Sequence, residues 1–590
     1  MKIFRLPGRD WAMGADEMVT TGGGNGAVRA VWFRTVAAWV LLSLPLAAHP
    51  LFWVRVFRSR LIVWHYVTLV TLPVMAAAAA AVLLLTGFRD IRRNCMAFRL
   101  NLLLVLSAAV LLVQSAARSI YTGTRLEPED WFLPLLPLAG MALSREILRI
   151  LPRWGTLVLA VLIVFTVRFP FFIGLPGNWN WNLSLLACLI PAPFLLFSLK
   201  STSFWIPVLA VAGFLGVFSA FRPELAPFGV IVGVIIASAA LWLLWKLPRR
   251  QRIFITILGG GAGIAMFLAI WLGPADSANR DSRIWLWRGS VELALRKGAL
   301  GIGSGKFERE IEPYLPKEYY FSKFAASLHS HPHNELLALW CAYGVPGVVF
   351  LMLFTLAAVS GLRNGSAIRV WGFWLFMVLS VHGEVDVLLQ TPLAGSLWLI
   401  VGGALAGDGR SSEEAHPWRG IAGALAVTAF TGVTFMASWY YREGMLSYWE
   451  HDRYIALKKL EKSLALRETP AARYIAGNIE RQLRNPRSAV RHFEKLSPGY
   501  LHSHLYMGWA YAEMGEYKAA LDCLDMEAKA FPMSALNVYK QLEIMRRTGE
   551  DEPSLASREA RLKYLLRLRG VSLEELLANH ELDDRPLRNP

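Results

Sequence analysis

The amino-acid sequence predicts an all-α protein with two parts, a polytopic membrane domain and a soluble helical repeat domain. The first observation is composition: 55% of the 590 residues are hydrophobic and the mean hydropathy is +0.39, which is rare in a soluble protein. The second is a series of apolar runs of roughly 17–25 residues, each long enough to cross a bilayer. The runs end near Tyr440, and the rest of the chain is rich in charged residues. We therefore expect about 12–13 transmembrane helices followed by a water-soluble domain.

The domain boundaries follow from these runs. Residues 1–35 are expected to form a cytoplasmic N-terminal segment, residues 36–440 the membrane domain and residues 441–590 the soluble domain. The first run lacks a small-residue cleavage site, so we interpret it as a retained span rather than a signal peptide. The predicted spans are 36–54, 62–87, 99–117, 131–147, 155–174, 181–198, 203–219, 226–245, 252–273, 335–359, 368–384, 392–407 and 419–440.

Basic loops orient these spans, because Lys and Arg concentrate on the cytoplasmic side. Loops 89–93, 145–153, 246–252 and 363–369 are basic and are placed in the cytoplasm. With strict alternation, the large loop 274–334, the turn 382–390 and the tail after Tyr440 face outward. Loop 55–60, with three arginines, would also lie outside, against the same rule. Because topology signals explain the net charge of +17, we predict membrane lipid and no nucleic acid as a partner.

The tail contains a pattern typical of helical repeats. Residues 498–532 resemble one tetratricopeptide repeat, with Leu505, Gly508 and Tyr511 on a first helix and a turn at Gly515. Weaker copies cover 454–467 and 472–496. Stacked helix pairs make a concave docking surface. The tail is therefore expected either to bind a protein partner or to serve only as a packing appendage.

The densest group of chemically active side chains lies just before the span 335–359. Histidines alternate at 329, 331 and 333, and Asn334 and Glu335 follow. Alternating histidines face one side only in an extended segment, and no Cys or carboxylate trio stands nearby at ligand spacing. The four cysteines of the chain also lie far apart. We therefore predict neither a metal site nor a cofactor.

This segment belongs to a longer motif. His333-Asn334 is followed by nine residues, then Gly344, two residues and Gly347. The pattern resembles the signature of the bacterial O-antigen ligase and O-antigen polymerase superfamily, which also includes protein O-oligosaccharyltransferases. Upstream, 283–287 and 301–307 are similar to the family's Arg-x-x-x-Trp and glycine-rich elements. Arg222 is similar to an outward arginine of the family, although Phe221 and Pro223 depart from the pattern.

The resemblance implies a multi-pass protein of the bacterial inner membrane with a fold like the GT-C glycosyltransferases. Such enzymes move a glycan from undecaprenyl diphosphate to a hydroxyl on the periplasmic side. Histidine titrates near neutral pH, so His333 is the candidate base. Arginine binds phosphate oxygens through a planar, charged fork, so Arg283 and Arg222 are the candidates for holding the diphosphate. Candidate substrate-binding residues are Asn334, Trp287, His331, His382 and Glu384.

Alternative roles are open for some of these side chains. Asn334 either orients the histidine ring or caps the following helix. Glu335 and Glu384 either act as acid or base or cap helix termini. His382 and Glu384, with Pro392, are similar to a turn in family members that glycosylate proteins.

Three activities share this framework: transfer of finished polymer to the lipid A core, extension of a glycan on a second lipid-linked repeat, and transfer to a protein hydroxyl. The tail and the 382–384 turn favour an acceptor larger than a lipid-linked sugar, so we predict a ligase-type transferase. A flippase of lipid-linked glycan is the competing class without chemistry; it predicts polar residues at mid-membrane, whereas here they gather at one face. A scaffold protein whose membrane part only anchors the helical repeats would need a single span, so the predicted dozen spans argue against that class.

Overall fold

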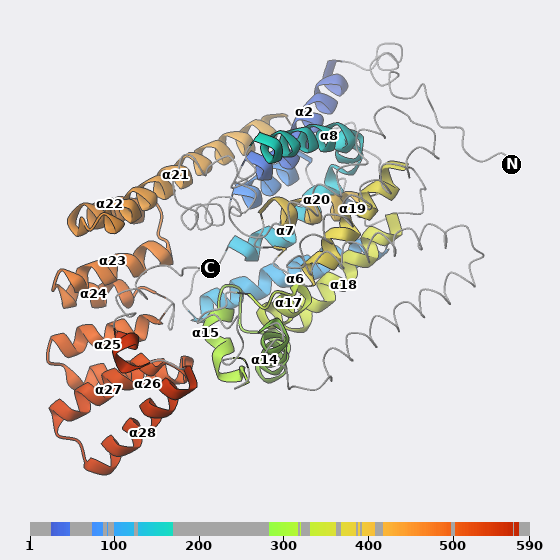
Figure 1. Ribbon diagram of the computed structural model, residues 1–590. Coiled ribbons are helices and arrows are strands. Elements are labelled where there is room, and N and C mark those ends of the chain that lie inside the picture. The colour runs from blue at the N-terminus through green and yellow to red at the C-terminus, as the bar shows by residue number, and fades with distance from the viewer. Residues whose placement is uncertain are drawn as a thin grey trace, which may run out of the picture. The chain divides into compact units, whose positions relative to one another are not determined.

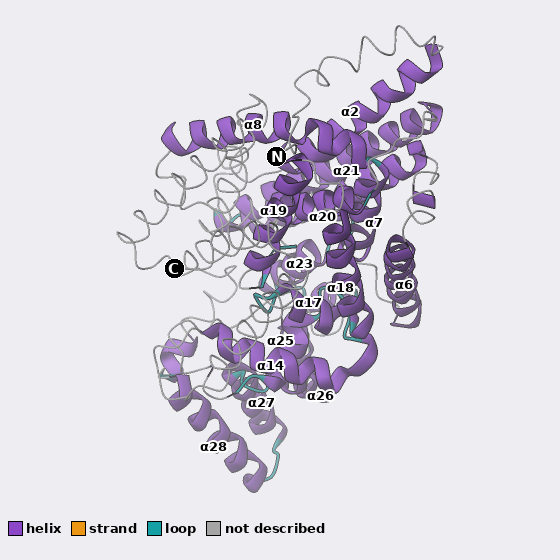
Figure 2. Ribbon diagram, turned by 90° about the vertical axis from the view of Figure 1, so that its right-hand side faces the viewer, coloured by secondary structure: helices purple, strands orange, loops and turns teal. Residues whose placement is uncertain are grey.

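The computed structural model describes residues 25–47, 74–86, 91–92, 99–122, 128–168, 282–316, 319, 331–361, 367–384, 388–389, 392–407, 417–496, 502–569 and 572–577. These residues form helices joined by turns, and Figure 2 shows no strand among them. The predicted all-α class is therefore confirmed. The predicted spans from 181 to 273 lie outside the described residues.

The chain divides into two compact units that interleave along the sequence. Unit 1 is Met1–Ser115, Glu127–Ala262 and Val348–Thr431, and unit 2 is Ala116–Leu126, Gly263–Gly347 and Gly432–Pro590. Unit 2 thus combines the large loop with the tail. Unit 1 contains α2 (Asn25–Ala47), the helix Val74–Thr86, most of α6 (Arg99–Thr122), α7 (Pro128–Ala142), α8 (Ser144–Arg168), most of α18 (Val345–Ser360), α19 (Ala367–Gly383), α20 (Pro392–Ala406) and the start of α21 (Pro417–Trp449).

Small residues bring the helices of unit 1 into backbone contact. A Cβ on Gly140 of α7 would lie 2.3 Å from the carbonyl oxygen of Ile400, and a Cβ on Gly403 of α20 would lie 2.1 Å from that of Pro137. No larger side chain fits at either position. Such close approach is typical of helices that associate in lipid, where dispersion and packing replace the hydrophobic effect.

Among the described residues of unit 1, two arginines are buried, and both are hydrogen-bonded. The guanidinium of Arg34, only 1% exposed, donates to the Glu146 carboxylate at 2.9 Å. Arg369 donates to the carbonyl oxygens of Leu405 and Gly407, at 3.0 and 2.9 Å. The last carbonyls of a helix have no partner inside it, so Arg369 satisfies the C-terminus of α20.

One described helix, Arg99–Tyr121, is long and apolar enough to cross a membrane by itself. Along it, Leu103, Leu106, Val110 and Val113 are about half or more exposed, at intervals of three and four residues. That spacing places them on one face of the helix, as expected of a lipid-facing surface. Asp130–Ala142 and Ser144–Val158 pass the same test only as a pair bent by 94°.

Within the described residues, two predicted spans are each divided by a break, and the predicted loop 145–153 is helical within α8. Residues 131–147 were expected as one helix, but the chain bends at Leu143, between α7 and α8. Residues 335–359 were also expected as one helix and are instead α17 (Glu335–Tyr343) and α18. Gly344 separates them with a φ of +69°, a left-handed conformation that ends a helix. Hydropathy cannot reveal such breaks, because the apolar run continues through them.

The tail consists of antiparallel helix pairs, coloured orange to red in Figure 1. They are α22 (Arg453–Leu466), α23 (Pro470–Gln482), α24 (Pro486–Phe493), α25 (Ser503–Glu513), α26 (Tyr517–Ala530), α27 (Ala535–Thr548) and α28 (Glu552–Arg569). Gly508 packs on Leu524 and Ala520, since its Cβ would lie 2.9 Å from the Leu524 side chain. Gly515, with a φ of +80°, makes the turn between α25 and α26. The repeat-like residues of the sequence therefore sit where one helix of a pair meets the next.

Candidate active site

His333 lies in a tight turn immediately before α17, within the loop part of unit 2. Its φ is +55°, in the left-handed region that residues other than glycine seldom adopt. Its side chain is half-buried. Backbone strain of this kind is held only where neighbouring groups over-determine the conformation.

The side chain of His331 is one such group. It is 7% exposed, and its Nδ1 accepts a hydrogen bond from the backbone N–H of His333 at 2.9 Å. Because Nδ1 is the acceptor, the proton of a neutral ring sits on Nε2. Nε2 lies 3.5 Å from Oε1 of Glu335, which is itself 2% exposed. His331 thus bends back to support the turn that carries His333.

Trp287 holds the same turn from the other side. It lies on α14 (Ser282–Lys297), and its Nε1–H donates to the carbonyl oxygen of Pro332 at 2.9 Å. The residue before His333 is therefore tied to α14, while His333 itself is tied to His331. The half-exposed indole of Trp287 lies beside the turn.

Asn334 is the N-cap of α17. Its extended backbone and its Oδ1, which accepts from the Leu337 N–H at 2.8 Å, have the geometry of a helix cap. Of the two roles open for Asn334, the structure displays capping. The cap contributes about 1 kcal/mol to such a helix and fixes where α17 begins.

Arg283 lies in the first turn of α14, one helical turn before Trp287, and is partly exposed. Residues four apart on a helix share a face. Arg283 therefore lies on the face of α14 whose Trp287 binds the His333 turn. The structure thus joins Trp287 to the turn that carries His333 and places Arg283 one helical turn before Trp287 on α14.

The glycines of the two sequence motifs interlock. A Cβ on Gly301 would lie 2.6 Å from the Cys341 carbonyl oxygen, and one on Gly344 would lie 2.1 Å from that of Ala299. The N–H groups of Ile302 and Gly303 donate to Cys341 and Ala342, both at 2.8 Å. The glycine-rich segment after α14 is thus bonded to the C-terminal end of α17, and the glycines make this approach possible.

Arg118 joins the same junction and was not singled out from the sequence. Its guanidinium donates to the carbonyl oxygens of Ala342 at 3.2 Å, Gly301 at 3.4 Å and Leu300. One planar fork thereby ties α17 to the glycine-rich segment. The signal in the sequence was an arginine at the outward end of a predicted span, against the usual distribution of positive charge.

The remaining predicted residues belong to other parts of the sequence. Arg222 is outside the described residues. His382 is in the last turn of α19 and Glu384 follows it, both in unit 1. His329 is also outside the described residues, and among the described ones no three His, Cys, Asp or Glu side chains form a metal-ligand group.

The segment that contains α14 and His333 matches a known protein family. Residues 185–352 match the O-antigen ligase family model. The O-antigen ligase match covers under a third of the chain and includes Arg222, α14, the glycine-rich segment and His333. It confirms the resemblance and supports a glycosyltransferase of ligase or polymerase type from a membrane-associated family.

Curated proteins and solved structures do not identify a relative of this chain. No curated protein matches the sequence. A chain in the crystal structure of the APC/C hetero-tetramer Cut9–Hcn1 aligns at 13% identity over 94% of this chain and 99% of that chain, with a TM-score of 0.22. A score this low does not establish a shared fold.

Proposed function

We propose that the protein is a ligase-type glycosyltransferase that moves a glycan from undecaprenyl diphosphate to a hydroxyl acceptor at the periplasmic face of the bacterial inner membrane. The observation that carries the proposal is the turn at His333. Its backbone is held in a left-handed conformation by His331, Trp287 and the Asn334 cap. That arrangement supports a preorganised histidine, as a positioned general base requires.

The proposed reaction is one displacement. The acceptor hydroxyl transfers its proton to the His333 imidazole while its oxygen forms a bond to the anomeric carbon of the glycan. The bond from that carbon to the diphosphate oxygen breaks, and undecaprenyl diphosphate leaves with the bonding electron pair. Negative charge grows on the diphosphate, so fixed positive charge nearby lowers the barrier.

Arg283 and Arg222 are proposed to bind the diphosphate. Arg283 projects from the α14 face that also carries Trp287, which supports a phosphate site beside the His333 turn. For Arg222 the support is its place within the O-antigen ligase match. His382 and Glu384 are proposed to contribute to acceptor binding, on their resemblance to family members that glycosylate proteins.

Polar contacts support the proposed multi-pass orientation. In unit 1, hydrogen bonds join positions that strict alternation places on the same side of the membrane. The cytoplasmic pairs are Arg34 with Glu146, Asn101 with Ala406, and Arg369 with Leu405, and the outward pair is Ser115 with Asp130. In unit 2, Arg118 and Gly301 are both expected outside and are hydrogen-bonded.

The acceptor is proposed to be the lipid A core, a larger acceptor than a lipid-linked repeat. The observation that favours it is the tail of helix pairs, which offers a docking surface beyond the membrane. Extension of a lipid-linked glycan and transfer to a protein are the competing activities, and flipping without transfer is the competing class.

The test is the envelope of a strain in which His333→Ala replaces the native protein. Loss of polymer from lipid A, with polymer accumulating on undecaprenyl diphosphate, is the result expected for a ligase. Lipid A capped by one repeat would instead identify a polymerase, and unglycosylated secreted proteins a protein glycosyltransferase. If a stably expressed His333→Ala protein leaves every glycan unchanged although deletion alters one, the assignment of His333 is wrong.

A further inference from the structure

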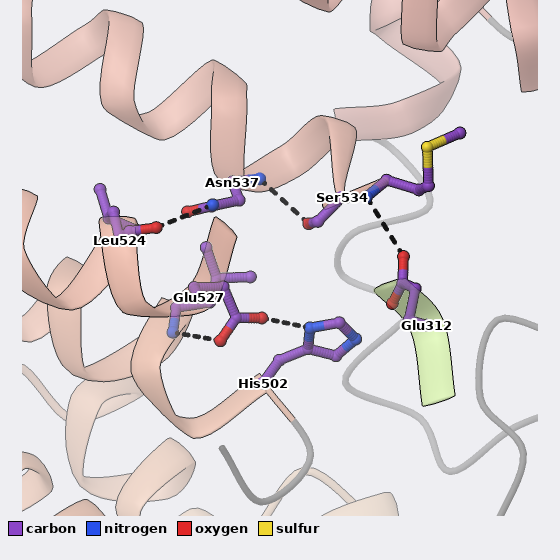
Figure 3. Close-up of polar contacts among 8 residues, drawn as sticks. Glu312, His502, Leu524, Glu527, Ser534 and Asn537 are labelled. Carbon is purple, nitrogen blue, oxygen red and sulfur yellow. Dashed lines mark hydrogen bonds and ion pairs between the residues drawn. The ribbon is translucent and has the colours of Figure 1, made fainter. Parts of the chain in front are cut away.

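A buried ion pair lies in the tail, close to where the tail meets the large loop within unit 2. His502 is the N-cap of α25 and has a φ of +61°. Its Nδ1 bonds Oε1 of Glu527 on α26, and the other oxygen of that carboxylate accepts from the Leu505 N–H at 3.2 Å. Glu527 is fully buried, so His502 supplies the charge that its carboxylate needs. Figure 3 shows the pair, with Glu312 of the loop nearby.

The loop contacts the tail through Glu312. This residue begins η3 (Glu312–Tyr314), is 9% exposed, and accepts a hydrogen bond on Oε1 from the Met533 N–H at 3.2 Å. Met533 lies in the turn between α26 and α27. The carbonyl of Pro532 in the same turn accepts from Arg561 of α28 at 3.0 Å. The tail therefore presents an ordered turn to the loop.

Three carboxyl groups from three elements face His502. They are Glu527 on α26, Glu312 on η3 and Glu308 on α15 (Phe307–Ile311). Burial acts to lower the pKa of His502, but these carboxylates outweigh it and raise the pKa above its usual value. Burial also raises the pKa of Glu308 to about 7, with His502 opposing the shift. Both groups therefore hold protons more tightly in the packed arrangement.

The contact is linked to the His333 turn through one hydrophobic core. Leu286 and Leu293 of α14, Phe307 and Ile311 of α15, and Cys341 of α17 form this core, with Tyr314 packed against it. The Tyr314 carbonyl also lies against Gly289 of α14, where a Cβ would come within 3.1 Å. The tail contacts Glu312, and the segment around Glu312 packs against α14. Trp287 of α14 in turn supports the His333 turn.

We propose that the face of the large loop formed by Glu308 and Glu312 is a docking surface for the tail, that the 531–534 turn and His502 occupy it, and that docking positions α14 for glycan transfer. The tail then lies on the same side of the membrane as His333. The docking contact does not depend on the proposed function. Its effect on glycan transfer does rest on that function.

Docking takes up protons, which gives it a pH dependence. In the packed arrangement burial raises the pKa of Glu308 from 4.5 to about 7, and the loop carboxylates Glu312 and Glu308 add to the effect of Glu527, in the tail itself, in raising the pKa of His502. Undocking therefore releases protons. The contribution of Glu308 is lost as pH rises from 4.5 to about 7, and the part of the His502 contribution that comes from Glu312 and Glu308 is lost as pH rises through the raised pKa of His502. Docking weakens toward alkaline pH.

Hydrogen exchange at the Met533 amide in the purified full-length protein tests the contact. Glu312→Ala removes the acceptor and is expected to speed exchange about tenfold, while Glu312→Gln keeps an acceptor oxygen and is expected to stay near native. Glu292→Ala is the matched control, since that carboxylate is half exposed on α14 and pairs with Arg296. Native exchange rates in Glu312→Ala would overturn the proposal.

The native protein provides a second measurement that does not depend on any variant folding. After correction for the intrinsic pH dependence of exchange, the protection of Met533 is expected to fall as pH rises from 4.5 to about 7, and further as pH rises through the raised pKa of His502. Protection that is constant with pH overturns the proton-linked docking. Because neither measurement uses glycan transfer, a protected Met533 in a protein without transfer activity would contradict the proposed function alone.

Discussion

His333 in the loop and His502 in the tail share an unusual local geometry and differ in what surrounds them. Each precedes a helix with a positive φ, +55° and +61°. The ring of His502 is bonded to the fully buried Glu527. Around His333, the backbone N–H donates to His331, the carbonyl of the preceding Pro332 accepts from Trp287, and the rings of His331 and His333 meet edge to face at 6.3 Å. The His502 ring completes a buried ion pair and so stabilises the fold, whereas the fixed turn at His333 supports the proposal that this histidine is positioned for a substrate.

The largest expected effect comes from His333→Ala. Removing a general base typically costs a factor of about 10²–10⁴, so we expect transfer by the purified protein to fall by roughly 10³-fold, while the thermal unfolding midpoint changes little. Parallel transfer and unfolding assays measure both. A large loss of stability would show that His333, like His502, stabilises the fold, and would contradict the distinction drawn between the two histidines.

The reverse pattern is expected for His502→Leu. The Glu527 carboxylate loses its partner, and a buried charge left unpaired costs about 2–3 kcal/mol. We expect the tail to unfold at lower denaturant concentration, and transfer to fall far less than in His333→Ala. Denaturant unfolding followed by tail fluorescence measures the loss. In the double variant His502→Leu with Glu527→Leu, the unpaired charge is absent and much of the stability is expected to return.

A smaller effect on transfer is expected for Trp287→Phe. The ring remains, but the N–H that holds the Pro332 carbonyl is gone, so the turn loses about 1 kcal/mol of support. We expect kcat to fall several-fold with KM nearly unchanged. The matched control is Trp340→Phe. This is the same change at a partly buried tryptophan of α17 that packs against the hydrophobic core between α14, α15 and α17. Equal losses in the two variants would show that the indole at 287 acts only by packing.

The smallest effect is expected for Arg118→Lys. A lysine keeps the charge but cannot span the carbonyls of Leu300, Gly301 and Ala342 with one planar group. We expect transfer to fall about two- to fivefold. The Ile302 amide, bonded to Cys341 in the native protein, should exchange faster. An unchanged exchange rate at Ile302 would show that the contact between the glycine-rich segment and α17 does not need the Arg118 guanidinium.

Much of this organisation is encoded locally. The helix pair α25 and α26 could be predicted because Gly508, Ala520 and the Gly515 turn each have a short-range reason for their place. The motif that contains Arg283, Trp287 and His333 was equally visible, since its members are chemically distinctive and regularly spaced.

The sequence by itself determined the helical class and the repeat-like tail and supplied the candidate site residues, because periodicity, glycine turns and charge are properties of neighbouring residues. Only the tertiary structure decided that His331 supports the His333 turn, that Asn334 caps α17, and that Arg118 and Glu312 reach other segments of unit 2. The physical reason is that such roles depend on which carbonyl or amide a side chain meets. That partner often lies hundreds of positions away, as Ala342 does from Arg118.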